Sequence, residues 1–171
     1  MKPLALALAA ALALASPALA GEQYVDRTGF AVSGYDVVAY RTLVQAPVGS
    51  DQPAPVPGRA DITAEWNGAT FAFATPENRA AFLADPARFA PQYDGHCAYG
   101  VSKGGKVPGN PALWRIVDDK LYLNITRNVV GFWEEDIPGN ISLAEGNWPG
   151  IEAGKASANP IPEFTSAAPV K

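Results

Sequence analysis

The sequence predicts a small single domain of the α+β class, in which short β-hairpins pack against short helices. At two places, short apolar runs bracket turn residues, and residues with helical spacing follow. Strands and helices therefore alternate without the long βαβ repeat of a doubly wound sheet. Large apolar residues between Trp66 and Trp148 supply a core. The chain needs this core because its single cysteine cannot form an internal disulfide.

Two hairpins are predicted from alternating apolar residues on either side of a turn. The first turn is Asn67-Gly68, the pair that best tolerates positive φ in a two-residue hairpin loop. The second is the polar stretch Asp118–Lys120. The predicted strands are Ile62–Trp66, Thr70–Ala74, Trp114–Val117 and Leu121–Leu123.

Three helices are predicted. Thr75-Pro76-Glu77 supplies an N-cap, a proline at the first helical position and an acid in the first turn, so a helix should run from Pro76 to about Ala84 with Phe82 and Leu83 facing the core. Two short amphipathic helices are indicated by apolar residues three and four apart, with Pro138-Gly139 between them. Their apolar residues are Val129, Phe132, Trp133 and Ile137, then Ile141, Ala144 and Trp148.

Residues 1–20 are typical of a secretory signal peptide. They combine the positive charge of Lys2, an apolar run from Leu4 to Leu14 and the small-residue site Ala18-Leu19-Ala20. The run is too short to span a membrane. We therefore expect a chain that starts near Gly21, has no membrane span and is periplasmic or secreted.

The composition favours a compact domain over residues 21–149 with irregular segments around its core. Residues 45–60 are rich in Pro, Gly and Ala and are expected to form an exposed loop. Residues 150–171 are small, polar and interrupted by proline, so a disordered tail is expected there. Without the leader the chain carries 12 basic and 17 acidic residues, and the bases are scattered, which argues against a nucleic-acid partner.

The only histidine and the only cysteine of the chain, His96 and Cys97, are neighbours. A structural zinc site needs about four ligands, and a soft copper(I) site favours a second thiolate or thioether. A metal site at this pair would therefore recruit carboxylates such as Asp94, or a second chain. Catalysis by the pair is disfavoured, because in an extended segment neighbouring side chains point to opposite faces.

Two other interpretations of the pair remain. In the first, Cys97 packs as a small hydrophobic side chain while His96 lies at the surface next to Asp94. In the second, Cys97 is a reactive free thiol whose pKa is lowered by a cation such as Lys103.

Several ordered blocks of the chain resemble the exported YHS-domain proteins of Gram-negative bacteria. The resemblance covers roughly residues 30–148, which makes residues 21–149 a YHS-like domain. It implies metal binding, because such domains are similar to the small cysteine-bearing metal-sensing modules of copper ATPases. The blocks are Gly34–Tyr40 (GYDVVAY), Ala64–Phe71 (AEWNGATF), Phe82–Pro86 (FLADP), Pro91–Tyr93 (PQY), Cys97–Tyr99 (CAY), Leu121–Asn124 (LYLN) and Trp148-Pro149 (WP).

We therefore expect an exported protein that binds a small ligand or a metal ion and is not an enzyme. If the ligand is a metal, copper or another soft transition metal is expected, with Cys97 and then His96 as the candidate ligands. The alternatives are a thiol-dependent redox or enzymatic protein, and a purely structural or partner-binding module.

Overall fold

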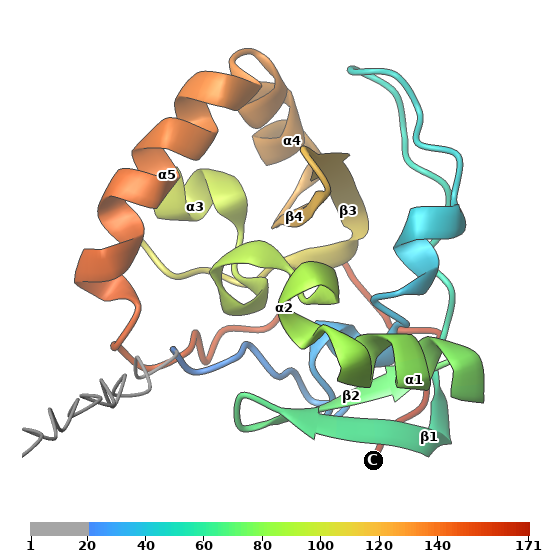
Figure 1. Cartoon of the computed structure of the whole chain (residues 1–171). Coiled ribbons are helices and arrows are strands. Elements are labelled where there is room, and N and C mark those ends of the chain that lie inside the picture. The colour runs from blue at the N-terminus through green and yellow to red at the C-terminus, as the bar shows by residue number, and fades with distance from the viewer. Residues whose placement is uncertain (1–20) are drawn as a thin grey trace, which may run out of the picture.

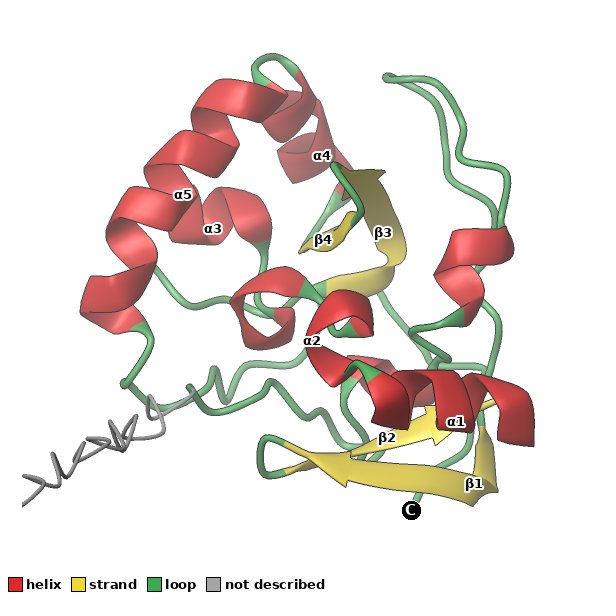
Figure 2. Ribbon diagram, in the orientation of Figure 1, coloured by secondary structure: helices red, strands yellow, loops and turns green. Residues whose placement is uncertain are grey.

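The computed structural model describes residues 21–171, so the predicted signal peptide and its cleavage site lie outside the described residues. Residues 21–171 form one α+β domain with two separate antiparallel hairpins, which confirms the predicted fold class (Figures 1 and 2). No helix in this range is both long and apolar enough to cross a bilayer. The elements are β1 (Arg59–Trp66), β2 (Ala69–Phe73), α1 (Pro76–Ala84), α2 (Pro86–Phe89), α3 (Ala98–Ser102), β3 (Asn110–Val117), β4 (Lys120–Asn124), α4 (Arg127–Glu134) and α5 (Ile137–Ile151).

Both hairpins turn where the sequence predicts. Asn67 and Gly68 have φ of 47° and 75°, and Asp118 and Asp119 have φ of 48° and 59°. Positive φ at both central residues is the turn geometry that matches the right-handed twist of paired strands. The second turn is thus one residue shorter than expected, and Lys120 already belongs to β4.

Helix α1 has the predicted bounds, and the Thr75 hydroxyl caps it by accepting the Asn78 N–H at 3.1 Å. Phe82 is fully buried, whereas Leu83 is 47% exposed, so the expectation that both face the core is wrong for Leu83. Successive residues on a helix point about 100° apart, and in α1 the core-facing side is the one that carries Phe82.

The Pro138-Gly139 pair lies inside the first turn of α5 and not between two helices as expected. Proline is tolerated there because the first N–H groups of a helix have no intrahelical partner. The Asp136 carboxylate caps this turn by accepting the Gly139 N–H at 3.0 Å. Helix α4 therefore ends before this cap, and α5 continues to Ile151.

Two apolar clusters stabilise the domain. The first lies where the first hairpin and α1 meet the N-terminal segment, with Phe71, Phe73 and Phe82 at its centre. The second lies under α3, α4 and α5 and is built around Trp133. Strand β4 contributes to both clusters, because neighbouring residues of a strand face opposite sides. Its Leu121 and Leu123 lie in the first cluster, and its Tyr122 lies in the second.

The C-terminal tail lies beside the N-terminal segment, where Figure 1 shows red chain next to blue. The Lys171 N–H donates to the Thr28 carbonyl at 2.8 Å, and the Ser166 hydroxyl donates to the Ser33 carbonyl at 2.7 Å. The structure thus places the tail against the domain and continues α5 to Ile151, whereas the composition predicts a domain that ends at residue 149 and a disordered tail over residues 150–171. Composition does not reveal these hydrogen bonds, because they join the tail to residues far away in the sequence.

Asp36, in the GYDVVAY block, is the buried carboxylate that fastens this N-terminal segment. One oxygen, Oδ1, accepts the N–H groups of Val38 and Ala39 at 2.9 and 3.2 Å. The other, Oδ2, accepts the Ala74 N–H at 2.8 Å and the Asn78 side-chain amide at 2.7 Å. The first hairpin, the start of α1 and the N-terminal segment therefore converge on one fully buried side chain.

Substitution Asp36→Ala should lower the free energy of unfolding by about 3–5 kcal/mol, because it leaves two buried backbone N–H groups and one partly buried backbone N–H group without an acceptor. Urea unfolding followed by tryptophan fluorescence measures the loss. Asp61→Ala is the control, since Asp61 is an exposed carboxylate paired only with exposed Arg59. Equal unfolding midpoints for the two variants would contradict the role of Asp36.

Candidate functional site

The structure separates the two candidate ligands, His96 and Cys97, to opposite sides of an extended segment. Both residues have extended backbone, with φ and ψ of −80° and 159° for His96 and −61° and 121° for Cys97. The His96 ring lies against Tyr24 and Trp148, and the Cys97 sulfur lies against Asn124. This divergence is the one that an extended segment predicts.

His96 is completely buried, so the expectation that it lies at the surface beside Asp94 is wrong. Its Nδ1 lies 2.9 Å from the Tyr93 carbonyl, and its Nε2 lies 3.1 Å from the Ser157 N–H. These partners assign the neutral tautomer with the proton on Nδ1. Ser157 belongs to the C-terminal tail, residues 150–171. The tail therefore lies against the His96 ring.

The environment of His96 strongly favours its neutral form. Burial lowers the pKa of His96 to about 4, although the hydrogen bond with Tyr93 opposes this shift. At neutral pH the imidazole therefore acts as a fixed hydrogen-bond link between the Tyr93 carbonyl and the tail. Neither nitrogen is open to a metal ion in this arrangement, because one donates and the other accepts.

Cys97 is also completely buried, which agrees with its packing as a small hydrophobic side chain. Its sulfur lies 3.4 Å from the Asn124 side-chain oxygen and accepts the Gly100 N–H at 3.3 Å, at the start of α3. Burial raises the pKa of the Cys97 thiol. The thiolate, which is the reactive and metal-binding form, is therefore scarce at neutral pH.

The residues around the pair do not form a metal-ligand cluster. Among residues 21–171, no three His, Cys, Asp or Glu side chains gather closely enough to hold a metal ion. Asp94, the carboxylate suggested as a further ligand, turns toward Gln23, whose amide donates to its Oδ1 at 2.5 Å. The structure thus brings none of the predicted ligands together.

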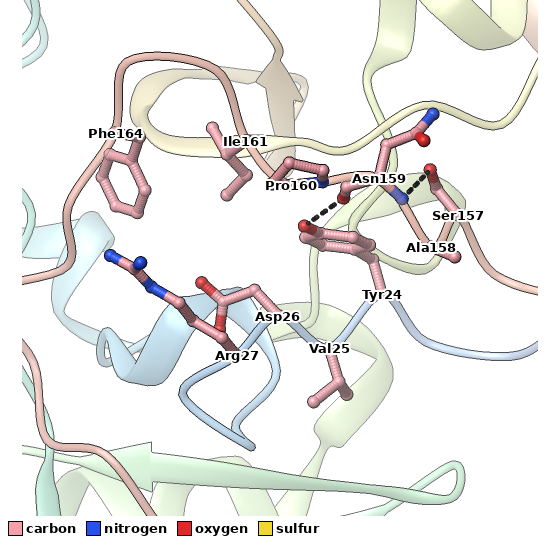
Figure 3. Close-up of a pocket in the computed structure, with 10 residues that line it drawn as sticks. All are labelled: Tyr24, Val25, Asp26, Arg27, Ser157, Ala158, Asn159, Pro160, Ile161 and Phe164. Atoms are coloured by element: carbon pink, nitrogen blue, oxygen red, sulfur yellow. Dashed lines mark hydrogen bonds between the residues drawn. The ribbon is translucent and has the colours of Figure 1, made fainter.

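A pocket of about 260 Å³ lies next to the buried histidine, between residues 24–27 and the tail residues 157–164 (Figure 3). The tail residues 157–164 form one wall of this pocket, and the hydrogen bond from the Ser157 N–H to His96 holds one end of that wall. The Tyr24 hydroxyl donates to the Asn159 carbonyl at 2.9 Å, which holds the same wall at a second point. The pocket is thus formed by two segments from opposite ends of the chain.

The lining combines one free cation with an apolar wall. Figure 3 shows the Arg27 guanidinium extending toward Phe164, and Arg27 makes no ion pair within residues 21–171. The neighbouring Asp26 carboxylate is already engaged, because its Oδ1 accepts the Thr28 N–H at 2.9 Å and the Thr28 hydroxyl. Apolar surface comes from Val25, Pro160, Ile161 and Phe164.

Sequence reasoning missed this pocket entirely. Residues 24–27 carry no motif, and the composition of the tail predicts disorder. Ile161 and Phe164 are the signal that could have found it, because large apolar residues are unusual in a tail that stays solvated. Ile161 is only 7% exposed, and the Phe164 ring lies 6.3 Å from the Tyr35 ring.

Comparison of the chain with family models, with curated proteins and with solved structures gave no match.

The histidine link should make stability sensitive to acid. Between pH 6.5 and about pH 4 the unfolded chain binds a proton that folded His96 does not, so acidification across this window destabilises the fold. The stability difference between the wild type and His96→Asn should therefore narrow by up to roughly 3 kcal/mol from pH 7 to pH 4. Urea unfolding at a series of pH values measures it, and a pH-independent difference would contradict the burial of neutral His96.

Cys97 should behave as a packed and unreactive thiol. Cys97→Ala should lower the free energy of unfolding by about 1–2 kcal/mol, the scale of a small core truncation. In the folded wild type the thiol should react with an aromatic disulfide reagent at least tenfold more slowly than in urea. Equal reaction rates in the folded and unfolded chains would show that the thiol is accessible.

Proposed function

We propose that the protein is an exported, periplasmic or secreted binding protein that holds a small ligand in the pocket between residues 24–27 and 157–164. The observation that carries this proposal is the unpaired Arg27 guanidinium beside the apolar wall that contains Phe164. A concave site with an apolar wall and few polar groups is the usual form of a small-ligand site.

The lining favours a small carboxylate with an apolar body. A guanidinium offers paired N–H donors that match a carboxylate, and Ile161 and Phe164 offer apolar contact to the rest of the molecule. The pocket volume of about 260 Å³ suits a ligand no larger than a small aromatic or short-chain acid. The Tyr24 ring, held by its bond to Asn159, closes the side of the pocket nearest His96.

The pocket chemistry favours binding without catalysis. The residues that line the pocket include no histidine or cysteine, and one oxygen of the Asp26 carboxylate, Oδ1, is engaged by Thr28. A nucleophile paired with a general base, which covalent catalysis needs, is therefore not assembled there. The resemblance of residues 30–148 to exported YHS-domain proteins is consistent with a binding role, and the pocket is formed by the segments that flank this stretch.

Metal binding at Cys97, the alternative function, requires the structure around Cys97 to change. A copper-type ion at Cys97 requires a thiolate released from Gly100 and Asn124, together with a second ligand from another chain or from a rearranged His96. Copper(I) titration in competition with a chelator separates the two functions. The pocket proposal expects equal affinities for the wild type and Cys97→Ser, whereas a metal site at Cys97 expects loss of tight binding in the variant.

Binding of benzoate, short-chain carboxylates and their uncharged amides tests the proposal by calorimetry. A carboxylate should bind, its amide should bind more weakly, and Arg27→Gln should weaken the carboxylate at least tenfold. Arg127→Gln is the matched control, because it removes the same charge from exposed α4. Loss of affinity in both variants or in neither, or no binding by any carboxylate, would overturn the proposal and leave a partner-binding module as the function.

A further inference from the structure

Gly21, the first described residue, lies directly against the side chain of Asp94. A Cβ atom placed on Gly21 would lie 2.2 Å from Asp94 Oδ2 and 2.6 Å from the Glu152 carbonyl oxygen. The Gly21 nitrogen is bonded to the same Cα, so it lies within about 5 Å of that carboxylate oxygen. The Gly21 carbonyl accepts the Asn67 side-chain amide at 3.1 Å, which fixes the residue in place.

The Asp94 carboxylate has one satisfied and one unsatisfied oxygen. Its Oδ1 accepts the amides of Gln23 and Asn67 at 2.5 and 3.4 Å. Its Oδ2 is buried and has no hydrogen-bond partner among residues 21–171. Burial, together with the nearby Glu152, raises the pKa of Asp94 to about 6 against the opposing effects of Lys106 and Gln23. An unpaired buried oxygen of this kind calls for a donor.

The nearest cation does not supply that donor. The Lys106 ammonium donates to the carbonyls of Glu152 and Gly154 at 2.7 and 2.6 Å and lies over the Trp148 ring at 5.1 Å. Glu22, which follows Gly21, and Glu152 are both acids and cannot donate; the Glu22 side chain accepts the Ala156 N–H. The space beside Asp94 Oδ2 is therefore faced by the backbone of Gly21 and by the carbonyl of Glu152.

We propose that the missing partner is the α-ammonium group of Gly21, released when residues 1–20 are removed. Hydrolysis of the Ala20–Gly21 peptide bond consumes one water, leaves a carboxylate on Ala20 and an amine on Gly21, and this amine is protonated at neutral pH. The new charge forms next to Asp94 Oδ2 and to the Glu152 carbonyl. Removal of the leader thereby locks the N-terminal segment onto the end of α5.

The identity of residue 21 fits this role. A side chain there would collide with the carboxylate that the amine is to meet and with a backbone oxygen, so only glycine allows the close approach. This contact between the Gly21 ammonium and Asp94 uses no residue that lines the ligand pocket. It acts on the same segment, because Tyr24 follows three residues later and donates its N–H to the Asp94 carbonyl at 2.8 Å.

The test compares two forms of the chain, one that starts at Gly21 and one that carries a short Ala-Ser extension before it. Asp94→Asn is introduced into each form, and Glu163→Gln serves as the control for loss of a carboxylate. In the form that starts at Gly21, Asp94→Asn should lower the folding equilibrium constant at least tenfold more than in the extended form. Glu163→Gln should behave alike in both forms.

A second measurement covers the case in which Asp94→Asn does not fold. The α-amine of the wild-type chain that starts at Gly21 should react with an acylating reagent at least tenfold more slowly when folded than when unfolded in urea. An equal effect of Asp94→Asn in the two forms, or an α-amine that reacts freely in the folded chain, overturns the proposal. So does an intact mass showing that the exported chain starts at a residue other than Gly21.

Discussion

The fold depends on one buried carboxylate, Asp36. Its four hydrogen bonds join the N-terminal segment to the end of the first hairpin and to the start of α1. Two of the donors are backbone N–H groups of this irregular segment, Val38 and Ala39, so the carboxylate takes the place of the strand or helix partners that the segment lacks there. The N-terminal segment, positioned in this way, becomes the surface on which the C-terminal tail lies.

The tail contributes to the site as well as to the fold. Ser157 satisfies His96, Asn159 holds Tyr24, and the apolar residues that follow form one wall of the pocket. His96 is thus the centre of a structural link, although it is the residue whose chemistry most suggests a ligand. Its burial becomes favourable once both nitrogens have partners, because an unpaired buried imidazole nitrogen would be costly.

Cys97 illustrates why a rare residue is weak evidence for chemistry. Its sulfur lies in a buried position between Asn124 and Gly100. There the sulfur acts as a cap for α3 and as a packing atom. A low-pKa thiolate needs a nearby cation or an open helix terminus, and the burial that raises the Cys97 pKa works in the opposite direction.

The sequence alone determined the local structure at the two hairpins and at the start of α1, because turns and caps depend on neighbouring residues. Asn67-Gly68 specified the first hairpin turn, Thr75-Pro76 specified the start of α1, and the alternation around Trp114 specified the second hairpin. Only the tertiary structure decided that the tail packs against the N-terminal segment, that His96 is buried and that Arg27 faces Phe164. These features join residues more than 60 positions apart, and composition or periodicity within a short window carries no information about such contacts.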